Sequence, residues 1–128
     1  RLRMVTLYQF AGQYKGIVVG TGNKVEDYGV GFYTKYGDGG VDISPIADLY
    51  KSEVWDLGKS LGIDSRIIEA KPTDGLWDDG RTDEDQLGAT YSELEEAMET
   101  GKGTGLKVLE QYGRMNAHKM NPIPTFTL

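Results

Sequence analysis

Cysteine is absent from the 128 residues, and histidine occurs only once. The lack of cysteine excludes disulfides, thiolate metal ligands and cysteine nucleophiles within this sequence. No apolar run approaches the roughly 20 residues of a membrane-spanning helix, and the first residues show no signal-peptide pattern. These features predict a cytoplasmic protein that does not enter a membrane.

Positive charge is also scarce. The sequence has 14 lysines and arginines against 20 acidic residues, which gives a net charge of -6. A nucleic-acid polymer is usually bound by a basic surface, and no basic stripe occurs along this chain. The composition therefore argues against a nucleic-acid partner. The length suits one domain with one modest core.

Common nucleotide and metal motifs are missing as well. The GKS of residues 58–60 ends like a P-loop, but Glu53 occupies the position of its first glycine. A dinucleotide fingerprint around GVGFYT would need glycine where Thr34 stands. The acidic loop around Gly80 lacks the first ligands of an EF-hand. His118 stands without a neighbouring nucleophile, and a lone histidine is more often structural than catalytic.

Glycines and a few separated charges are concentrated in residues 20–42, GTGNKVEDYGVGFYTKYGDGGVD, directly after the apolar run GIVV. Glycine lets the backbone approach a ligand closely. A helix to about Gln13, a buried-type strand over 16–20 and then a glycine-rich loop indicate an α/β layer. Ligands collect beyond the carboxyl ends of strands in such layers, so this segment is predicted to bind one.

The remaining chain is predicted to be largely helical. Ser44 and Gly62 are expected to cap the two ends of the longest helix, and Thr90 with Glu93 forms a capping box. Residues 71–88 are polar and acidic with turn signals, which predicts an exposed, mobile loop. The other expected helical segments are a turn near 24–28, a short helix within 63–70 and a last helix over roughly 106–117.

Several motifs match one family when they are taken in chain order: VVGTGNKVED, GFYTKYGDGGVDISPIADLYK, KPTDGLW, TDEDQLG and HK. The chain resembles the C-terminal half of an ammonia-dependent NAD synthetase, a member of the N-type ATP pyrophosphatases. The likeness covers nearly all of the sequence, and TKYGDGG is its most specific part. It implies an α/β, Rossmann-like three-layer fold of the adenine-nucleotide α-hydrolase type, here helix-rich.

The family's pyrophosphate-binding loop, SGGxDS, does not occur in this sequence. The chain also opens without an initiator methionine, inside a helical pattern. Residues 1–128 are therefore expected to be the C-terminal portion of a single synthetase domain whose P-loop half is missing. This portion alone is predicted to be inactive.

The resemblance implies ATP- and Mg²⁺-dependent amidation of deamido-NAD, the last step of NAD biosynthesis. The nicotinate carboxylate is adenylated first, and ammonia then displaces AMP. A carboxylate is a poor electrophile, and both ATP and the dinucleotide are anionic. Cations and a metal ion must offset their repulsion, which suits a few positive charges set in pliable backbone.

The resemblance also assigns roles to individual residues. Glu26 is implied as the Mg²⁺ ligand. The implied ATP contacts are Thr21, Lys51 and Thr73, and the loop after Thr73 is expected to close as a lid that excludes water. The implied deamido-NAD contacts are Arg1, Lys35, Asp42, His118 and Lys119.

Each of these residues also has a plainer interpretation. Thr21 could cap a turn, and Lys51 could extend along its helix so that its ammonium reaches water. The other charged residues could be ordinary solvated surface groups.

Other functions remain open at this point. A glutamine-dependent synthetase would receive ammonia from a separate amidase domain. A GMP or asparagine synthetase relative should lack TKYGDGG, and a non-catalytic module would bind nucleotide without reaction. The first helix is apolar around its circumference, which predicts a homodimer interface or burial under the missing half.

Overall fold

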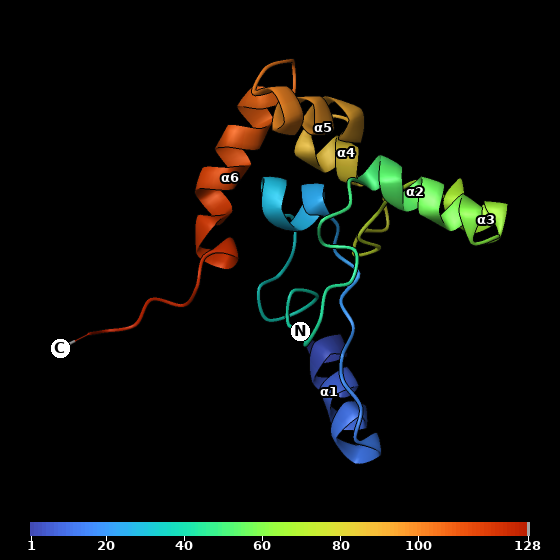
Figure 1. Cartoon of the computed structure of the whole chain (residues 1–128), viewed down its shortest axis with the longest axis vertical. Helices are drawn as coiled ribbons and strands as arrows, with labels where there is room; N and C mark the ends of the chain where they lie inside the picture. Colours follow the sequence, from blue (N-terminus) through green and yellow to red (C-terminus); the bar gives the residue numbers. More distant parts are fainter. Residues whose placement is uncertain (128) are drawn as a thin grey trace.

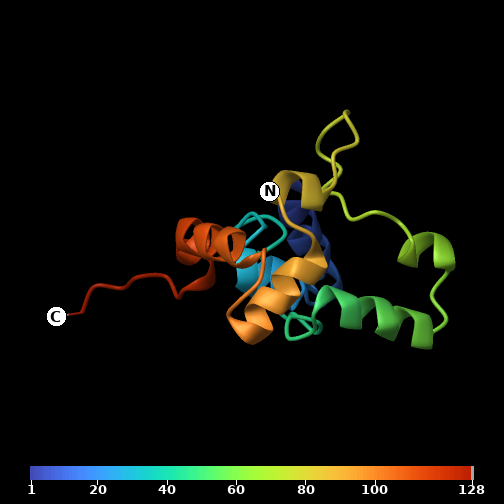
Figure 2. The ribbon, with the colours of Figure 1, turned by 90° about the horizontal axis from the view of Figure 1, so that it is seen from above.

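The computed structural model describes residues 1–127 as a small helical body from which two arms project (Figure 1). The elements in chain order are α1 (Leu2–Tyr14), the π-helix η1 (Lys24–Val30), α2 (Lys51–Ser60), α3 (Ser65–Ile68), α4 (Asp83–Leu87), α5 (Tyr91–Thr100) and α6 (Leu106–Met120). Helix α1 forms one arm (Figure 1), and the α2–α3 pair forms the other, as Figure 2 also shows. None of the helices in these residues combines the length and apolar character needed to cross a membrane.

The strand expected over residues 16–20 takes part in a single parallel bridge, between Val19 and Ile43. The N–H of Gly20 donates to the carbonyl of Ile43 over 2.7 Å, and the N–H of Asp42 donates to that of Val18 over 2.9 Å. Across residues 1–127, this bridge does not extend into a longer pairing of strands. Two segments therefore lie side by side as neighbouring parallel strands do, with α1 before the first of them.

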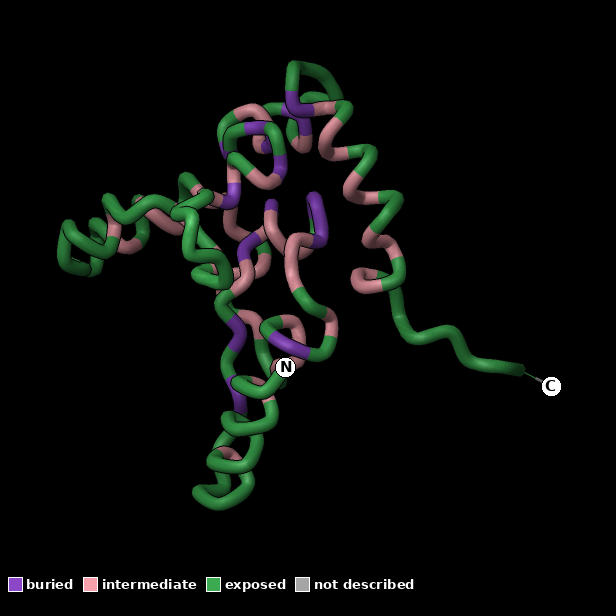
Figure 3. The backbone as a smooth tube through the Cα atoms, turned by 180° about the vertical axis from the view of Figure 1, so that it is seen from behind, coloured by how far each residue is buried: buried purple, intermediate pink, exposed green. Residues whose placement is uncertain are grey.

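The core lies where η1, α4 and α5 meet. Its buried members are Val25, Val30, Leu87, Ala89, Tyr91 and Leu94. Helix α6 covers them with Val108, Leu109 and Tyr112, and Figure 3 shows the buried backbone gathered in this region. Each fully buried large apolar side chain contributes roughly 1.5–3 kcal/mol. The core thus fixes η1, which carries the predicted metal ligand.

Helix α1 has no buried residue. Leu2 is 85% exposed and Phe10 is 52% exposed. Its Leu7, Phe10 and Tyr14 line an apolar groove of about 330 Å³, together with Ile17 from the segment that follows the helix. An apolar surface is therefore uncovered in this chain, which fits a homodimer interface and burial under a missing half equally.

Helix α2 begins at Lys51 and not at Ser44 as predicted. Two tight turns occupy the preceding residues, with the N–H of Leu49 donating to the carbonyl of Ile46 over 3.1 Å. Tyr50 is extended, at φ -65° and ψ 160°, and its N–H donates to the Glu53 carboxylate over 2.7 Å. Because Tyr50 is extended, the helix cannot include the residues before it, although the spacing of their apolar side chains predicted a helix.

The expectation of a loop throughout residues 71–88 is wrong, because α4 occupies Asp83–Leu87. Thr82 caps this helix by accepting the N–H of Asp85 over 3.1 Å, while the Asp85 carboxylate accepts the N–H of Thr82 over 2.9 Å. The sequence therefore contains a capping box that was not predicted, with aspartate in place of the usual glutamate. The segment before it projects from the body (Figure 2).

The other helix predictions are confirmed. Thr90 and Glu93 form their capping box, with the N–H of Glu93 reaching the Thr90 hydroxyl over 3.2 Å. Gly62 follows α2 with a φ of 70°, a conformation that glycine adopts without a steric penalty. Helix α6 continues to Met120, three residues beyond the expected end.

Candidate nucleotide-binding site

The site begins at η1, a seven-residue π-helix between two fixed ends. The buried Asn23 side chain accepts the N–H groups of Val25 and Glu26, each over 3.0 Å. Gly31 ends the helix with a φ of 62°. Short π-helical turns are rare and frequently mark functional sites. Here the turn carries the neighbouring acids Glu26 and Asp27 within the glycine-rich segment.

Glu26 lies in a hydrogen-bonded ion pair. Its Oε1 accepts the Lys51 ammonium over 2.9 Å and the Tyr91 hydroxyl over 2.7 Å. The side chains of Glu26 and Lys51 are each 18% exposed. Two residues with predicted roles toward ATP and Mg²⁺ are therefore in direct contact, largely removed from water.

A second carboxylate reaches the same tyrosine. The Tyr91 hydroxyl lies 3.1 Å from Oδ2 of Asp83, a residue that is 8% exposed. Burial raises the pKa of Asp83, and the bond to Tyr91 offsets part of that effect. Burial and the charge of Glu26 raise the pKa of Tyr91 well above its ordinary range, so the phenol keeps its proton.

This arrangement fits part of a Mg²⁺ site. A tyrosine hydroxyl has one proton to donate, yet it stands between the carboxylates of Glu26 and Asp83. Oδ1 of Asp83 is buried without a hydrogen-bond partner. Across residues 1–127, however, no three acidic, histidine or cysteine side chains are grouped closely enough to hold a metal. Mg²⁺ usually takes one or two protein carboxylates and completes its shell with phosphate oxygens and water, which this donor set permits.

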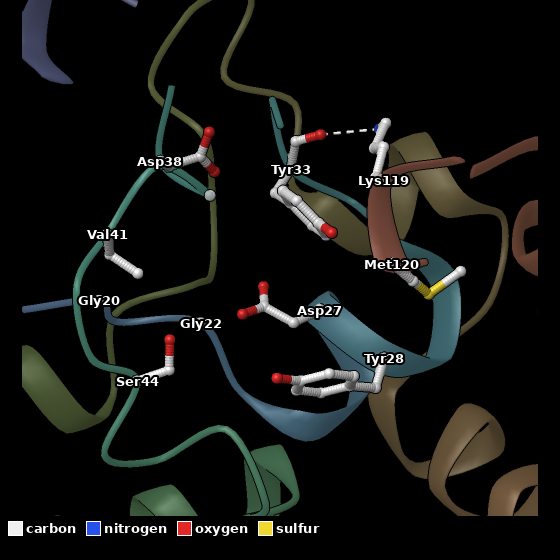
Figure 4. Close-up of a pocket in the computed structure, with 11 residues that line it drawn as sticks. Gly20, Gly22, Asp27, Tyr28, Tyr33, Asp38, Val41, Ser44, Lys119 and Met120 are labelled. Atoms are coloured by element: carbon white, nitrogen blue, oxygen red, sulfur yellow. Dashed lines mark hydrogen bonds between the residues drawn. The ribbon is translucent and has the colours of Figure 1, made fainter. Parts of the chain in front are cut away.

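A polar cavity of about 160 Å³ lies beside η1 (Figure 4). Gly22 and Asp27 line one side, and Tyr33, Asp38 and Lys119 line another. Close packing in the cavity wall explains why two of its positions are glycine. A Cβ on Gly22 would lie 2.1 Å from an Asp27 carboxylate oxygen, and a Cβ on Gly39 would lie 2.4 Å from the Tyr33 ring.

Asp27 is one of the titratable groups that line this cavity. Burial, followed by the charges of Glu26 and Asp38, raises its pKa from 3.8 to about 6. The sequence motifs predict no role for Asp27. Its only signal is its position beside Glu26 in the glycine-rich segment, and this does not separate it from other surface acids.

The end of α6 meets the loop after η1. The Lys119 ammonium donates to the carbonyl oxygens of Gly31 over 2.8 Å and Tyr33 over 2.7 Å. Burial lowers the pKa of Lys119. The Lys35 ammonium donates to the carbonyl of His118, whose own side chain is exposed. Three of the predicted dinucleotide contacts are thus together, although more than 80 residues separate Lys35 from His118.

The other predicted residues lie apart from these groups. Asp42 accepts the N–H of Val18 over 2.8 Å and the Tyr8 hydroxyl over 3.2 Å, so it joins α1 to the parallel pair. Arg1 is exposed at the start of α1.

Both predicted ATP-contacting threonines are exposed. Thr21 stands between Gly20 and Gly22, which line the cavity. The Thr73 hydroxyl donates to the carbonyl of Arg81 over 3.1 Å and so closes the base of the loop between them.

Comparison with known proteins decides the family. The family model for NAD synthase matches residues 1–123. The chain belongs to the NAD synthase family. A relative named NH(3)-dependent NAD(+) synthetase, from Alkaliphilus oremlandii, is 46% identical over 98% of this chain and 50% of its own length. Another of that name, from Archaeoglobus fulgidus, is 53% identical over 77% of the chain and 39% of its length.

Solved structures of the family confirm the expected α/β fold. The NMN synthetase from Francisella tularensis has a TM-score of 0.87 and 42% identity, covering 99% of this chain and 53% of that one. The NH3-dependent NAD synthetase from Campylobacter jejuni has a TM-score of 0.69 and 28% identity, covering 98% and 52%. The chain thus spans about half the length, or less, of the family members named here. The resemblance to NAD synthetases stated from the sequence is confirmed.

Proposed function

We propose that the whole protein to which this chain belongs converts deamido-NAD into NAD with ATP and ammonia. Membership of the NAD synthase family supports the reaction class. The observation in this chain that carries it furthest is the largely buried contact between Glu26 and Lys51. Asp27, the next residue of η1, lines the glycine-walled cavity. The Glu26 carboxylate could bind the metal ion of a nucleotide, and the adjacent Lys51 ammonium could bind its phosphate.

The residues are proposed to act in two groups. Mg²⁺, held by Glu26 and phosphate oxygens, would neutralise charge on the nucleotide. The ATP contacts are Thr21, Lys51 and Thr73, and the dinucleotide contacts are Arg1, Lys35, Asp42, His118 and Lys119. A nicotinate carboxylate oxygen then attacks the α-phosphorus of ATP, and pyrophosphate leaves. Ammonia attacks the acyl carbon, and AMP leaves with that carboxylate oxygen.

The chain's own role is to hold the two anions together and to limit water. Lys51 brings a positive charge against Glu26, and Lys119 brings one to the cavity wall. The loop based at Thr73 would cover the acyl-adenylate as a lid. We place the P-loop in the half of the synthetase domain that this chain does not contain, so residues 1–128 alone are proposed to be inactive. The apolar groove of α1 would be covered by a second copy, and the whole protein would act in the cytoplasm.

One structural comparison favours a second candidate. The Francisella protein, with its TM-score of 0.87, is named an NMN synthetase. The same adenylation and amidation on nicotinate mononucleotide would yield NMN. The two candidates differ in substrate length and not in chemistry.

A single assay distinguishes these functions. The whole protein would be incubated with ATP, Mg²⁺ and either acid, with ammonium or glutamine as the nitrogen source. We expect NAD and AMP from deamido-NAD with ammonium, measured by liquid chromatography and mass spectrometry. A higher rate with the mononucleotide would establish the second candidate, and a requirement for glutamine would overturn the nitrogen source. Nucleotide binding without any amide would leave only a binding module.

A further inference from the structure

Tyr91, the first residue of α5, contacts charged side chains from three other elements. Its hydroxyl lies 2.7 Å from Oε1 of Glu26 in η1 and 3.1 Å from Oδ2 of Asp83 in α4. The Lys51 ammonium in α2 lies 5.1 Å from the centroid of its ring. Tyr91 is 2% exposed.

We propose that Tyr91 is the positioning residue of the ATP–Mg²⁺ site, which sets the geometry of both Glu26 and Lys51. The inference rests on the proposed function, because it assigns Tyr91 to the site that the function requires. Tyr91 would act through these two residues and would not itself contact the nucleotide.

The physical reason lies in the free-energy cost of a largely buried ion pair. Removing a carboxylate and an ammonium from water is unfavourable unless further hydrogen bonds satisfy their remaining donors and acceptors. Tyr91 donates a hydroxyl hydrogen bond to Glu26 and presents its aromatic ring to the Lys51 ammonium. Trp55 packs against this ring in an edge-to-face arrangement, with the two ring centroids 6.3 Å apart. A single rigid side chain therefore restrains both charges.

Tyr91 also connects this pair to the predicted lid. Its hydroxyl contacts Asp83, whose backbone N–H donates to the carbonyl of Pro72 over 3.0 Å. Pro72 directly precedes Thr73, a predicted ATP contact. The backbone N–H of Tyr91 adds a bond to the Glu84 carboxylate over 2.9 Å. Movement of the lid base and the orientation of Glu26 are thus linked through one residue.

The test compares Tyr91→Phe with Tyr112→Phe in the whole protein. Tyr112 is a matched control, because it belongs to the same core and its hydroxyl donates to the carbonyl of Gln86 over 3.0 Å. Manganese binding would be measured by electron paramagnetic resonance in the presence of a non-hydrolysable ATP analogue.

Loss of a group that orients a metal ligand typically weakens metal binding by about 10-fold or more. We expect that loss for Tyr91→Phe and less than about 2-fold for Tyr112→Phe, with the KM for deamido-NAD unchanged in both. In a Glu26→Gln background, Tyr91→Phe should have no further effect on manganese binding. Equal manganese affinities for the two tyrosine variants would overturn the inference.

A second measurement needs no destabilising substitution. With 3-fluorotyrosine at position 91, Mn²⁺ and the ATP analogue should broaden the fluorine resonance more than they do with the same label at position 112. Equal broadening would count against Tyr91. If the unsubstituted protein failed to bind manganese with the ATP analogue, the proposed function itself would fail, which is a separate outcome.

Discussion

The Lys51 ammonium lies 2.9 Å from Oε1 of Glu26, although the two residues are 25 positions apart in the chain. Both side chains are largely shielded from water, each with 18% of its surface exposed. The ammonium is therefore held by a carboxylate and not by solvent. This contact joins the glycine-rich segment to α2 and gives the proposed site its charged centre.

Replacing Lys51 tests that centre. Lys51→Met keeps the length of the side chain but removes its charge, so we expect ATP–Mg²⁺ to bind at least about 10-fold more weakly in isothermal calorimetry. The unpaired Glu26 should also lower the stability of the fold. Lys59→Met is the matched control, since Lys59 is on the same helix in an exposed pair with Asp56. Wild-type ATP affinity in Lys51→Met would exclude the assigned contact.

Asp27 predicts a specific pH dependence of stability. Its pKa rises from 3.8 to about 6 on folding, so the folded state holds this proton more tightly than the unfolded state does. Stability should therefore decrease as the pH rises from about 4 to 6. A pKa difference of this size corresponds to about 3 kcal/mol of stability, and the partial exposure of Asp27 to solvent reduces our expectation to about 1 kcal/mol. Urea unfolding of Asp27→Asn should lack this decrease, and parallel pH profiles for both proteins would refute the assignment.

Two glycine substitutions test the cavity wall. The Cβ of Gly39→Ala would lie 2.4 Å from the Tyr33 ring, which lies beside Lys119. We expect a loss of about 1–3 kcal/mol in unfolding free energy and weaker dinucleotide binding. Gly12→Ala in α1 meets nothing within 4 Å and should increase stability by up to about 1 kcal/mol. If thermal unfolding showed the same change for both variants, the close approach at Gly39 would be irrelevant.

Asp42 has both a structural and a proposed substrate role, and two variants separate them. Tyr8→Phe removes only the hydroxyl that donates to Asp42, so it should lower the free energy of unfolding slightly and leave the KM for deamido-NAD unchanged. Asp42→Ala should lower stability further and also raise that KM. An unchanged KM in Asp42→Ala would leave the residue with a structural role alone.

Local signals in the sequence were sufficient for most helices. The Thr90–Glu93 capping box and Gly62 are decided by hydrogen bonds and dihedral angles within a few residues, and both predictions are confirmed. Helix α4 was missed because its capping box uses Asp85 instead of glutamate. The start of α2 was misplaced because Tyr50 adopts an extended conformation, which the spacing of the apolar residues around it does not predict.

The site was predictable only where motifs name single residues. Glu26 and Lys51 were chosen by resemblance, but nothing in the sequence indicates that they touch. Tyr91 and Asp83 were missed because their importance comes from tertiary contacts. The Tyr91 hydroxyl reaches Glu26, 65 positions away, and Asp83, 8 positions away. The meeting of Lys119 with Tyr33 is likewise a product of tertiary packing.

The most direct test of the proposed chemistry follows one oxygen atom. Deamido-NAD labelled with oxygen-18 in its nicotinate carboxylate would be converted by the whole protein with ATP, Mg²⁺ and ammonium. Adenylation of the carboxylate predicts one labelled oxygen in the phosphate of AMP for each NAD formed, as measured by mass spectrometry. AMP without the label, alongside NAD production, would contradict an acyl-adenylate and with it the role proposed for this chain.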